Sequence, residues 1–280
     1  MEVVLNLQFD EERALYGSDS VKAIGCRFDG PQDGESAFKE SSNVEAENCY
    51  FNLRYPFWHD RGVLINNCEM TELCRAALWY SESVRILASK LHGIKALREC
   101  ADIEISDSDI SSAEFGWFSR NINIKNTSCA GEYFMFRAEK LSFEGVSLKG
   151  KYSFQYITDS VFENCNFDTK DAFWHAKNVV VRNSVIKGEY LAWYCENVTF
   201  ENCIISGTQP FCYCKGLKLI NCEMHRADLA FERSDVCADI TTPVISIKNA
   251  YSGKISLPAC EDIIVSDENA KCEIIIGDVE

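Results

Sequence analysis

Residues able to carry out acid–base chemistry gather in the first third of the sequence. They are carboxylates, a histidine and two arginines in the segments GPQDGES, LRYPFWHD and TELCRAA: Asp33, Glu35, Arg54, His59, Glu72 and Arg75. Because histidine has a near-neutral intrinsic pKa and guanidinium groups bind carboxylates, this set suits proton transfer on an acidic sugar. The same charges can also pair with one another on a solvated turn, and both interpretations stay open.

A second set of candidates is aromatic and recurs at a fixed place in a repeating pattern. All five tryptophans occupy one column of that repeat, and the next column is often histidine or tyrosine. Lys39 and Arg98 share the tryptophan column, and since burying an unpaired cation is costly, we expect this column to face outward at least in part. The candidate ligand-binding residues are Trp58, Trp79, Tyr80, Trp117, Trp174, His175, Trp193 and Tyr194.

An outward column of aromatic rings has two functional interpretations. Flat rings spaced along a solenoid suit an extended carbohydrate, because sugars pack their CH faces on aromatic faces. A contiguous apolar strip equally marks a protein interface, such as the seam of a homodimer. If the rings instead stack in the core, neither interpretation applies.

Signals for a metal or a cofactor are few. One carboxylate cluster, in the segment DIEISDSDISS, offers the oxygen ligands that calcium takes: Glu104, Asp107 and Asp109. The cysteine spacings fit no standard zinc site, and the sequence has no Gly-rich phosphate loop, His-Glu-x-x-His or Gly-x-Ser-x-Gly motif. We therefore predict no resident cofactor and leave open whether the chain is an enzyme.

All these candidates are positioned by a repeat of about nineteen residues. With Asn178 as position zero, equivalent positions fall at Ser20, Asn43, Gly62, Ser83, Asp102, Asn121, Lys140, Asp159, Asn178, Asn197 and Gly216. A fixed period near twenty predicts a solenoid with one coil per repeat. The two longer coils carry their extra residues around GPQDGES and TELCRAA, so we expect these insertions to project on one side.

The columns of the repeat predict short strands separated by corners. Positions three and eight are apolar in all eleven coils, and the residues beside position three are mostly polar, which is a period-two alternation. Position five is Asn in seven coils, and Asn tolerates the left-handed backbone of a sharp corner. Six of the fifteen cysteines fall at position six, where we interpret them as small packing residues rather than reactive thiols.

The predicted fold is all-β, a right-handed parallel β-helix of about eleven regular coils. We predict a single domain over residues 1–280, with an N-terminal cap in 1–19, regular coils in 20–234, and irregular coils with a cap in 235–280. A four-sided helix of the pentapeptide-repeat kind is an alternative, because corners also recur at positions zero, five and ten.

Three strings of the sequence carry a family resemblance. FDEERALYGSDSVKAIGCRFDGPQDGESAFKE, NCYFNLRYPFWH and TELCRAALWYS resemble a family of uncharacterised bacterial proteins with a pectin-lyase-like parallel β-helix. The resemblance runs over nearly the whole chain and implies the fold, but it offers no catalytic residues to carry over. Other pectin-lyase-like folds are polysaccharide lyases, hydrolases or epimerases, which is an analogy at the level of the fold.

The net charge and the composition limit which classes of binding partner the chain can have. A net charge of −15 argues against binding to nucleic acid or to an anionic membrane surface. The sequence shows no signal-peptide pattern and no membrane-spanning stretch, so we expect a cytoplasmic protein with reduced cysteines. The leading functional prediction is the binding or modification of a carbohydrate along the aromatic column. A non-enzymatic scaffold, with this column as a protein or homo-oligomer interface, comes second, and an acidic mimic of nucleic acid is a distant third.

Overall fold

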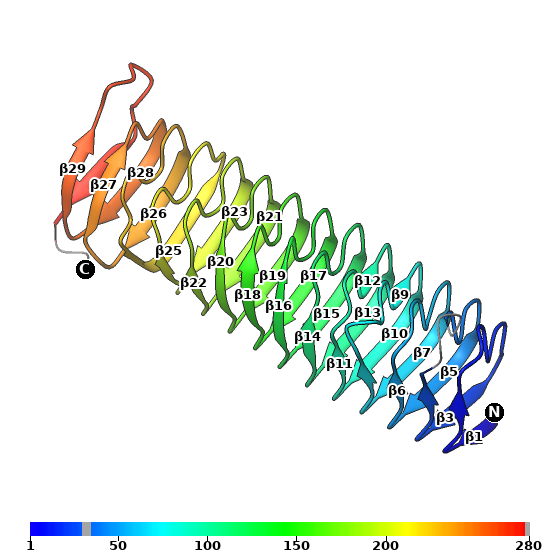
Figure 1. The fold of residues 1–280 in the computed structure, drawn as a ribbon. Coiled ribbons are helices and arrows are strands. Elements are labelled where there is room, and N and C mark those ends of the chain that lie inside the picture. The colour runs from blue at the N-terminus through cyan, green and yellow to red at the C-terminus, as the bar shows by residue number, and fades with distance from the viewer. Residues whose placement is uncertain (30–34, 278–280) are drawn as a thin grey trace. The chain divides into compact units, whose positions relative to one another are not determined.

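The chain folds into stacked parallel strands joined by tight turns. A computed structural model describes residues 1–29 and 35–277, and this part of the chain contains no helix. Two compact units, Met1–Ser142 and Phe143–Glu280, are both parallel β-solenoids, and the chain makes about fourteen turns (Figure 1). The predicted parallel β-helix is confirmed, with a few more coils than expected. No helix in the described residues has the length and hydrophobicity that crossing a bilayer requires.

The strands of the first unit are short and closely spaced. They are β1 (Glu2–Leu5), β2 (Gln8–Phe9), β3 (Val21–Ile24), β4 (Arg27–Phe28), β5 (Ser42–Glu47), β6 (Tyr50–Phe51), β7 (Arg61–Asn66), β8 (Glu69–Met70), β9 (Leu78–Trp79), β10 (Glu82–Leu87), β11 (Lys90–Leu91), β12 (Leu97–Arg98), β13 (Ala101–Ser106), β14 (Asp109–Ser111), β15 (Arg120–Lys125) and β16 (Ser128–Glu132).

The point of division lies within β17 (Glu139–Glu144), and the remaining strands belong to the second unit. They are β18 (Ser147–Lys151), β19 (Thr158–Glu163), β20 (Asn166–Lys170), β21 (Lys177–Arg182), β22 (Val185–Lys187), β23 (Glu196–Glu201), β24 (Ile204–Ser206), β25 (Leu217–His225), β26 (Asp235–Ile240), β27 (Val244–Lys248), β28 (Ser252–Leu257), β29 (Cys260–Ile264) and β30 (Glu273–Ile276).

Parallel pairing stacks each coil of the first unit on the next in register. Ile65, Ile86 and Ile105 are partners in the sheet formed by β7, β10 and β13. Phe51 and Met70 are partners in the second sheet, between β6 and β8. The apolar columns predicted at positions three and eight are therefore core columns, because in-register stacking places equivalent residues one above the other.

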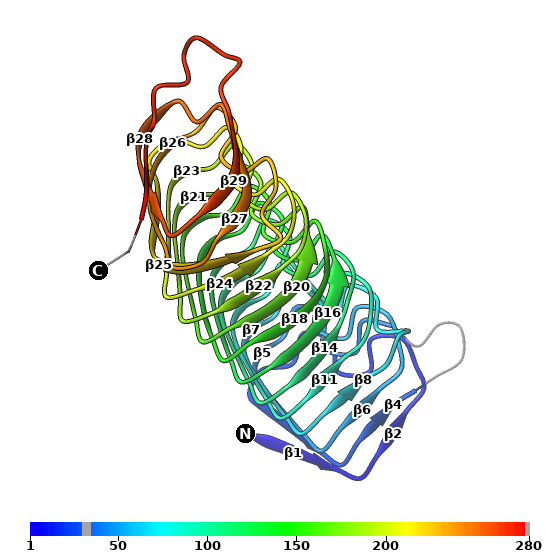
Figure 2. The same cartoon turned by 90° about the vertical axis from the view of Figure 1, so that its left-hand side faces the viewer.

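The stack of the first unit begins at β1, within the segment that the sequence suggested as a cap. β1 pairs with β3 and β2 pairs with β4, so residues 1–19 form a coil in register with the next one (Figure 2). Val4 is the partner of Ala23, and Phe9 stacks on Phe28 at 4.9 Å between ring centroids. Glu2 occupies position one, which is apolar in most other coils. Because of this charge, the sequence pattern did not identify residues 1–19 as a coil of the repeat.

Parallel pairing between successive coils continues to β30, the last strand of the second unit. Position three continues from Leu219 through Ala238 and Ile255 to Ile274. Two irregularities disturb the repeat near its end. The pairing of β25 with β26 shifts register between Leu219 and Cys222, and the step from Ala238 to Ile255 is seventeen residues. The strands still pair, so residues 235–276 extend the solenoid.

Asparagines form the predicted corners. All seven position-five asparagines have a left-handed backbone, with φ between 46° and 55°. In the second unit Asn221 Nδ2 donates to Asn202 Oδ1 at 2.9 Å, and Asn202 Nδ2 donates to Asn183 Oδ1 at 3.3 Å. These hydrogen bonds run from coil to coil and hold the corners of successive coils over one another.

The cysteines act as packing residues. Twelve of the fifteen are buried, including all six at position six, and the structure has them as free thiols. Burial raises the pKa of Cys165 to about 11, which keeps this thiol protonated and unreactive at neutral pH.

Candidate functional site

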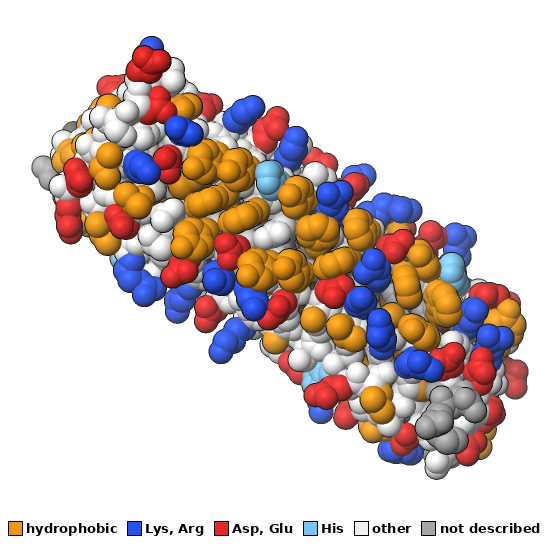
Figure 3. All heavy atoms as spheres, turned by 45° about the horizontal axis from the view of Figure 1, so that its top comes forward, with side chains coloured by type: hydrophobic (Ala, Val, Ile, Leu, Met, Phe, Trp, Pro, Cys, Tyr) orange, Lys and Arg blue, Asp and Glu red, His pale blue; other side chains and the backbone are white. Residues whose placement is uncertain are grey.

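Residues with a left-handed backbone alternate with others where a buried column meets two outward columns. Phe173 and His175 have φ values of 61° and 56°; Phe173 is fully buried, whereas Trp174 and His175 are half-buried. We call the two outward columns the aromatic stripe. It comprises Trp58, His59, Trp79, Tyr80, Trp117 and Phe118 in the first unit, and Tyr156, Trp174, His175, Trp193, Tyr194 and Tyr213 in the second. Hydrophobic side chains form bands between charged ones on the face shown in Figure 3.

In the first unit, cations are part of the stripe. Lys39 Nζ lies 4.4 Å from the ring centroid of Trp58, which stacks on Trp79 at 6.1 Å. The Arg98 guanidinium lies between two indoles, 5.7 Å from Trp79 and 5.2 Å from Trp117. The negative potential of the ring faces attracts these two cations. Each also pairs with a carboxylate, Lys39 with Glu40 at 3.7 Å and Arg98 with Glu99 at 3.3 Å.

In the second unit, the stripe is an unbroken ladder of rings. Centroids are 4.6 Å apart from Tyr156 to His175, 5.0 Å from His175 to Tyr194, and 4.8 Å from Tyr194 to Tyr213, with interplanar angles of 10°, 7° and 11°. Beside it, Trp174 and Trp193 stack at 5.3 Å and 4°. Each inner ring therefore covers the faces of its neighbours and presents its edge and its polar tip.

The indole N–H groups fix the orientation of the tryptophans. Trp174 Nε1 donates to the carbonyl of Tyr190 and Trp193 Nε1 to the carbonyl of Gln209, both at 2.7 Å. In the first unit, the indole N–H of Trp58 is buried without a hydrogen-bond partner among the described residues.

The surroundings of two rings of the ladder, His175 and Tyr213, favour their uncharged forms. Burial and the nearby Lys177 lower the pKa of His175 below its ordinary value. Burial, and then the charge of Glu232, raise the pKa of Tyr213. Imidazole and phenol groups in this state both donate and accept hydrogen bonds.

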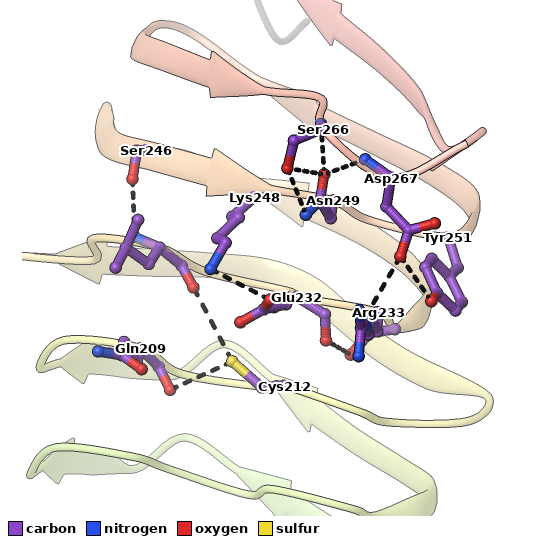
Figure 4. A network of polar contacts seen from close by, with 12 residues as sticks. Gln209, Cys212, Glu232, Arg233, Ser246, Lys248, Asn249, Tyr251, Ser266 and Asp267 are labelled. Atoms are coloured by element: carbon purple, nitrogen blue, oxygen red, sulfur yellow. Dashed lines mark hydrogen bonds and ion pairs between the residues drawn. The ribbon is translucent and has the colours of Figure 1, made fainter. Parts of the chain in front are cut away.

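The ladder ends against a polar network. Glu232 follows Tyr213 in the column and pairs with Lys248 at 3.1 Å (Figure 4). Beside it, Arg233 Nε lies 3.3 Å from Asp267 Oδ2. Charged pairs thus replace rings at this end of the stripe.

The acid–base candidates of the first unit do not converge in the part of the chain that the structure describes. Asp33 lies outside the described residues. Arg54 Nη2 lies 2.8 Å from Glu35 Oε2, the pairing that the sequence left open as the alternative. His59 belongs to the stripe and stacks on Tyr80 at 4.7 Å.

The remaining two acid–base candidates, Glu72 and Arg75, are exposed. Glu72 lines a shallow hollow together with His92 and Gly131. Among the described residues, neither side chain forms a hydrogen bond or ion pair with His59 or Arg54, so the geometry gives the five described candidates no shared acid–base site.

Two of the three suggested calcium ligands are engaged elsewhere. Glu104 pairs with Arg85 at 3.2 Å, and Asp109 Oδ2 lies 2.7 Å from His92 Nε2. The described residues hold no group of three histidine, cysteine, aspartate or glutamate side chains suited to a metal ion.

The buried acid Asp60 was not among the residues predicted from the sequence. Asp60 is buried, and its Oδ1 accepts a hydrogen bond from the Ser41 backbone N–H at 2.9 Å, while its Oδ2 has no partner among the described residues. Burial raises the pKa of Asp60 to about 8. The equivalent residues in the following coils are Ser81 and Cys100. An acid in a column of small residues is the sequence feature that could have revealed Asp60.

Comparison with known proteins places the chain in a family. The model of DUF3737, a family of proteins of unknown function, matches residues 2–276. This chain belongs to DUF3737. No curated protein matches.

Solved structures similar to this DUF3737 chain are distant. The A-module of the mannuronan C-5 epimerase AlgE4 of Azotobacter vinelandii has a TM-score of 0.36 and 11% identity, covering 83% of this chain and 87% of that one. The Streptococcus pneumoniae surface protein and adhesin PfbA has a TM-score of 0.34 and 9% identity, covering 98% and 88%. At these values we draw no functional argument from either.

Proposed function

We propose that this DUF3737 chain binds an extended carbohydrate along the aromatic stripe of its second unit, without modifying it. The observation that carries the proposal is the ladder from Tyr156 through His175 and Tyr194 to Tyr213, with rings 4.6 to 5.0 Å apart. A surface that repeats the same contact at every coil suits a ligand that also repeats, and a polysaccharide lying along the stripe is such a ligand.

The ladder would contact sugars by its edges and tips. Tyr156 and Tyr194 are 40% and 45% exposed, so their phenol groups reach solvent. Phenol and imidazole tips offer donors and acceptors to sugar hydroxyls, and the ring edges offer apolar contact. Since the acid–base candidates of the first unit do not converge, the proposal is limited to binding.

Removing one inner ring tests the proposal. Tyr194→Ala takes away a phenol group and a rung, and we expect it to weaken the binding of a neutral hexasaccharide about tenfold, as loss of an anchoring Tyr does. A glycan array finds the sugar, and a tryptophan-fluorescence titration measures the affinity. Ile204→Ala, an exposed apolar side chain on β24 outside the stripe, is the matched control. A flat response of the unsubstituted chain to neutral and acidic glycans would end the proposal.

A protein interface is the second candidate function, favoured by the closed ring faces. His175 is covered on both faces by Tyr156 and Tyr194, so no inner face is free to stack on a sugar. Tyrosine and tryptophan edges with polar tips are enriched at protein interfaces. Light scattering after size exclusion distinguishes this candidate, because it predicts a dimer that Tyr194→Ala converts to monomer.

A further inference from the structure

Six residues of the second unit line a hollow of about 250 Å³ that none of the functions above uses. They are Gly188, Glu189, Ser206, Gly207, Thr208 and Arg226. They follow or end the short strands β22 and β24 and the long strand β25. The hollow therefore lies where three successive coils turn.

Glycines create the space. A Cβ on Gly207 would lie 2.0 Å from the carbonyl oxygen of Gly188, and a Cβ on Gly188 would lie 2.2 Å from that of Thr169. Such contacts exclude any side chain at these two positions, because successive coils approach closely here. Without side chains at Gly188 and Gly207, the hollow stays open to solvent.

Arg226 is held in place by a neutral partner. Its Nε and Nη2 donate to Ser206 Oγ at 3.2 and 3.0 Å. Arg182 and Arg233 pair with carboxylates, but Arg226 has no carboxylate within ion-pair distance in the part of the chain that the structure describes. A guanidinium has five N–H groups, so the Ser206 contact orients Arg226 and leaves donors for a ligand.

The lining offers donors and acceptors in balance. Arg226 donates, the Glu189 carboxylate accepts, and the hydroxyls of Ser206 and Thr208 do both. An anion would use the donors and be repelled by Glu189. A neutral sugar, whose hydroxyls both donate and accept, can satisfy the whole set. The volume is below the roughly 300–1,000 Å³ of sites for whole small molecules, which fits a single sugar unit.

The hollow adjoins the aromatic stripe through the backbone. Glu189 and Thr208 precede Tyr190 and Gln209, whose carbonyls accept the indole N–H groups of the two tryptophans beside the ladder. The Tyr190 ring also meets Trp193 edge to face at 5.5 Å. A glycan along the stripe thus has this hollow at its side.

We propose that this hollow is the subsite for one neutral sugar unit of the glycan bound along the stripe, an inference that rests on the proposed function. Arg226 and Glu189 are the residues that select its hydroxyls. The subsite gives the preference for neutral over acidic glycans, because Glu189 faces any added negative charge.

Calorimetric titration of the full chain tests the subsite. The probes are cellohexaose, xylohexaose and laminarihexaose, with hexagalacturonate as the acidic counterpart. Arg226→Ala and Glu189→Gln are each expected to weaken binding of the neutral probe about tenfold, the loss of one hydrogen bond to a charged group. Arg182→Ala, which removes a paired arginine on β21, is the matched control and is expected to leave the affinity unchanged.

The outcomes separate the subsite from the proposed function. If Tyr194→Ala weakens binding while Arg226→Ala and Glu189→Gln leave the affinity unchanged, the subsite is wrong and the function stands. If hexagalacturonate binds more tightly than every neutral probe, the assigned sugar class is wrong. If no probe binds, the function and the subsite fall together. Circular dichroism confirms that each variant is folded.

Discussion

At the scale of single residues, Asp60 is the most unusual group in the first unit. It stands in a buried column of small side chains, and burial raises its pKa from 3.8 to about 8. The unfolded chain releases this proton at much lower pH than the folded one. The stability contribution is therefore fully present below about pH 4 and is lost as the pH rises towards 8.

Replacing Asp60 by the serine of the next coil removes this pH dependence. Asp60→Ser is expected to raise the free energy of unfolding at pH 8.5 by roughly 2–4 kcal/mol, with a smaller gain at pH 5.5. Urea unfolding at the two pH values measures both numbers. Equal gains at the two pH values would show that Asp60 is not protonated in the folded chain.

Ala88 has a strained backbone at a corner where most coils have asparagine. Its φ is 47°, in the left-handed region that a Cβ disfavours by roughly 1–2 kcal/mol. Ala88→Gly is expected to raise the free energy of unfolding by about 1 kcal/mol. Ala130→Gly is the control, because Ala130 is exposed on β16 and its φ is not positive, so there the change should destabilise. Destabilisation at both positions would show that the positive φ of Ala88 does not strain the folded chain.

At the scale of elements, close approach between coils sets what each turn tolerates. Gly188→Ala is expected to lower the free energy of unfolding by at least about 2 kcal/mol, because its Cβ would meet the Thr169 carbonyl. Gly17→Ala is the comparison, since Gly17 also has positive φ, 62°, but nothing lies within 4 Å of its Cβ. Thermal unfolding ranks the two variants, and equal losses would mean that backbone strain rather than contact decides.

The strands and corners were predictable where the repeat is strict. Columns three and eight and the asparagine corner follow from spacing alone, because each coil must place equivalent residues over those of its neighbour. The ends were harder to predict. Glu2 interrupts an apolar column at the first coil, and the short step from Ala238 to Ile255 breaks the period near the last one.

At the scale of the whole molecule, the candidate site was predictable in composition but not in geometry. The sequence placed the tryptophans in one column, yet ring orientation depends on the left-handed turns and on the carbonyls that accept the indole N–H groups. Likewise, the pairing of Arg54 with Glu35 depends on which side chains meet across coils, which spacing does not decide.

A crystal structure of the full chain grown with a neutral hexasaccharide would show carbohydrate binding by direct observation. We expect density for sugar units running along the edges of Tyr156, His175, Tyr194 and Tyr213, with one unit in the hollow beside Arg226. Sugar density on another face, or a second copy of the chain covering these rings, would contradict this expectation.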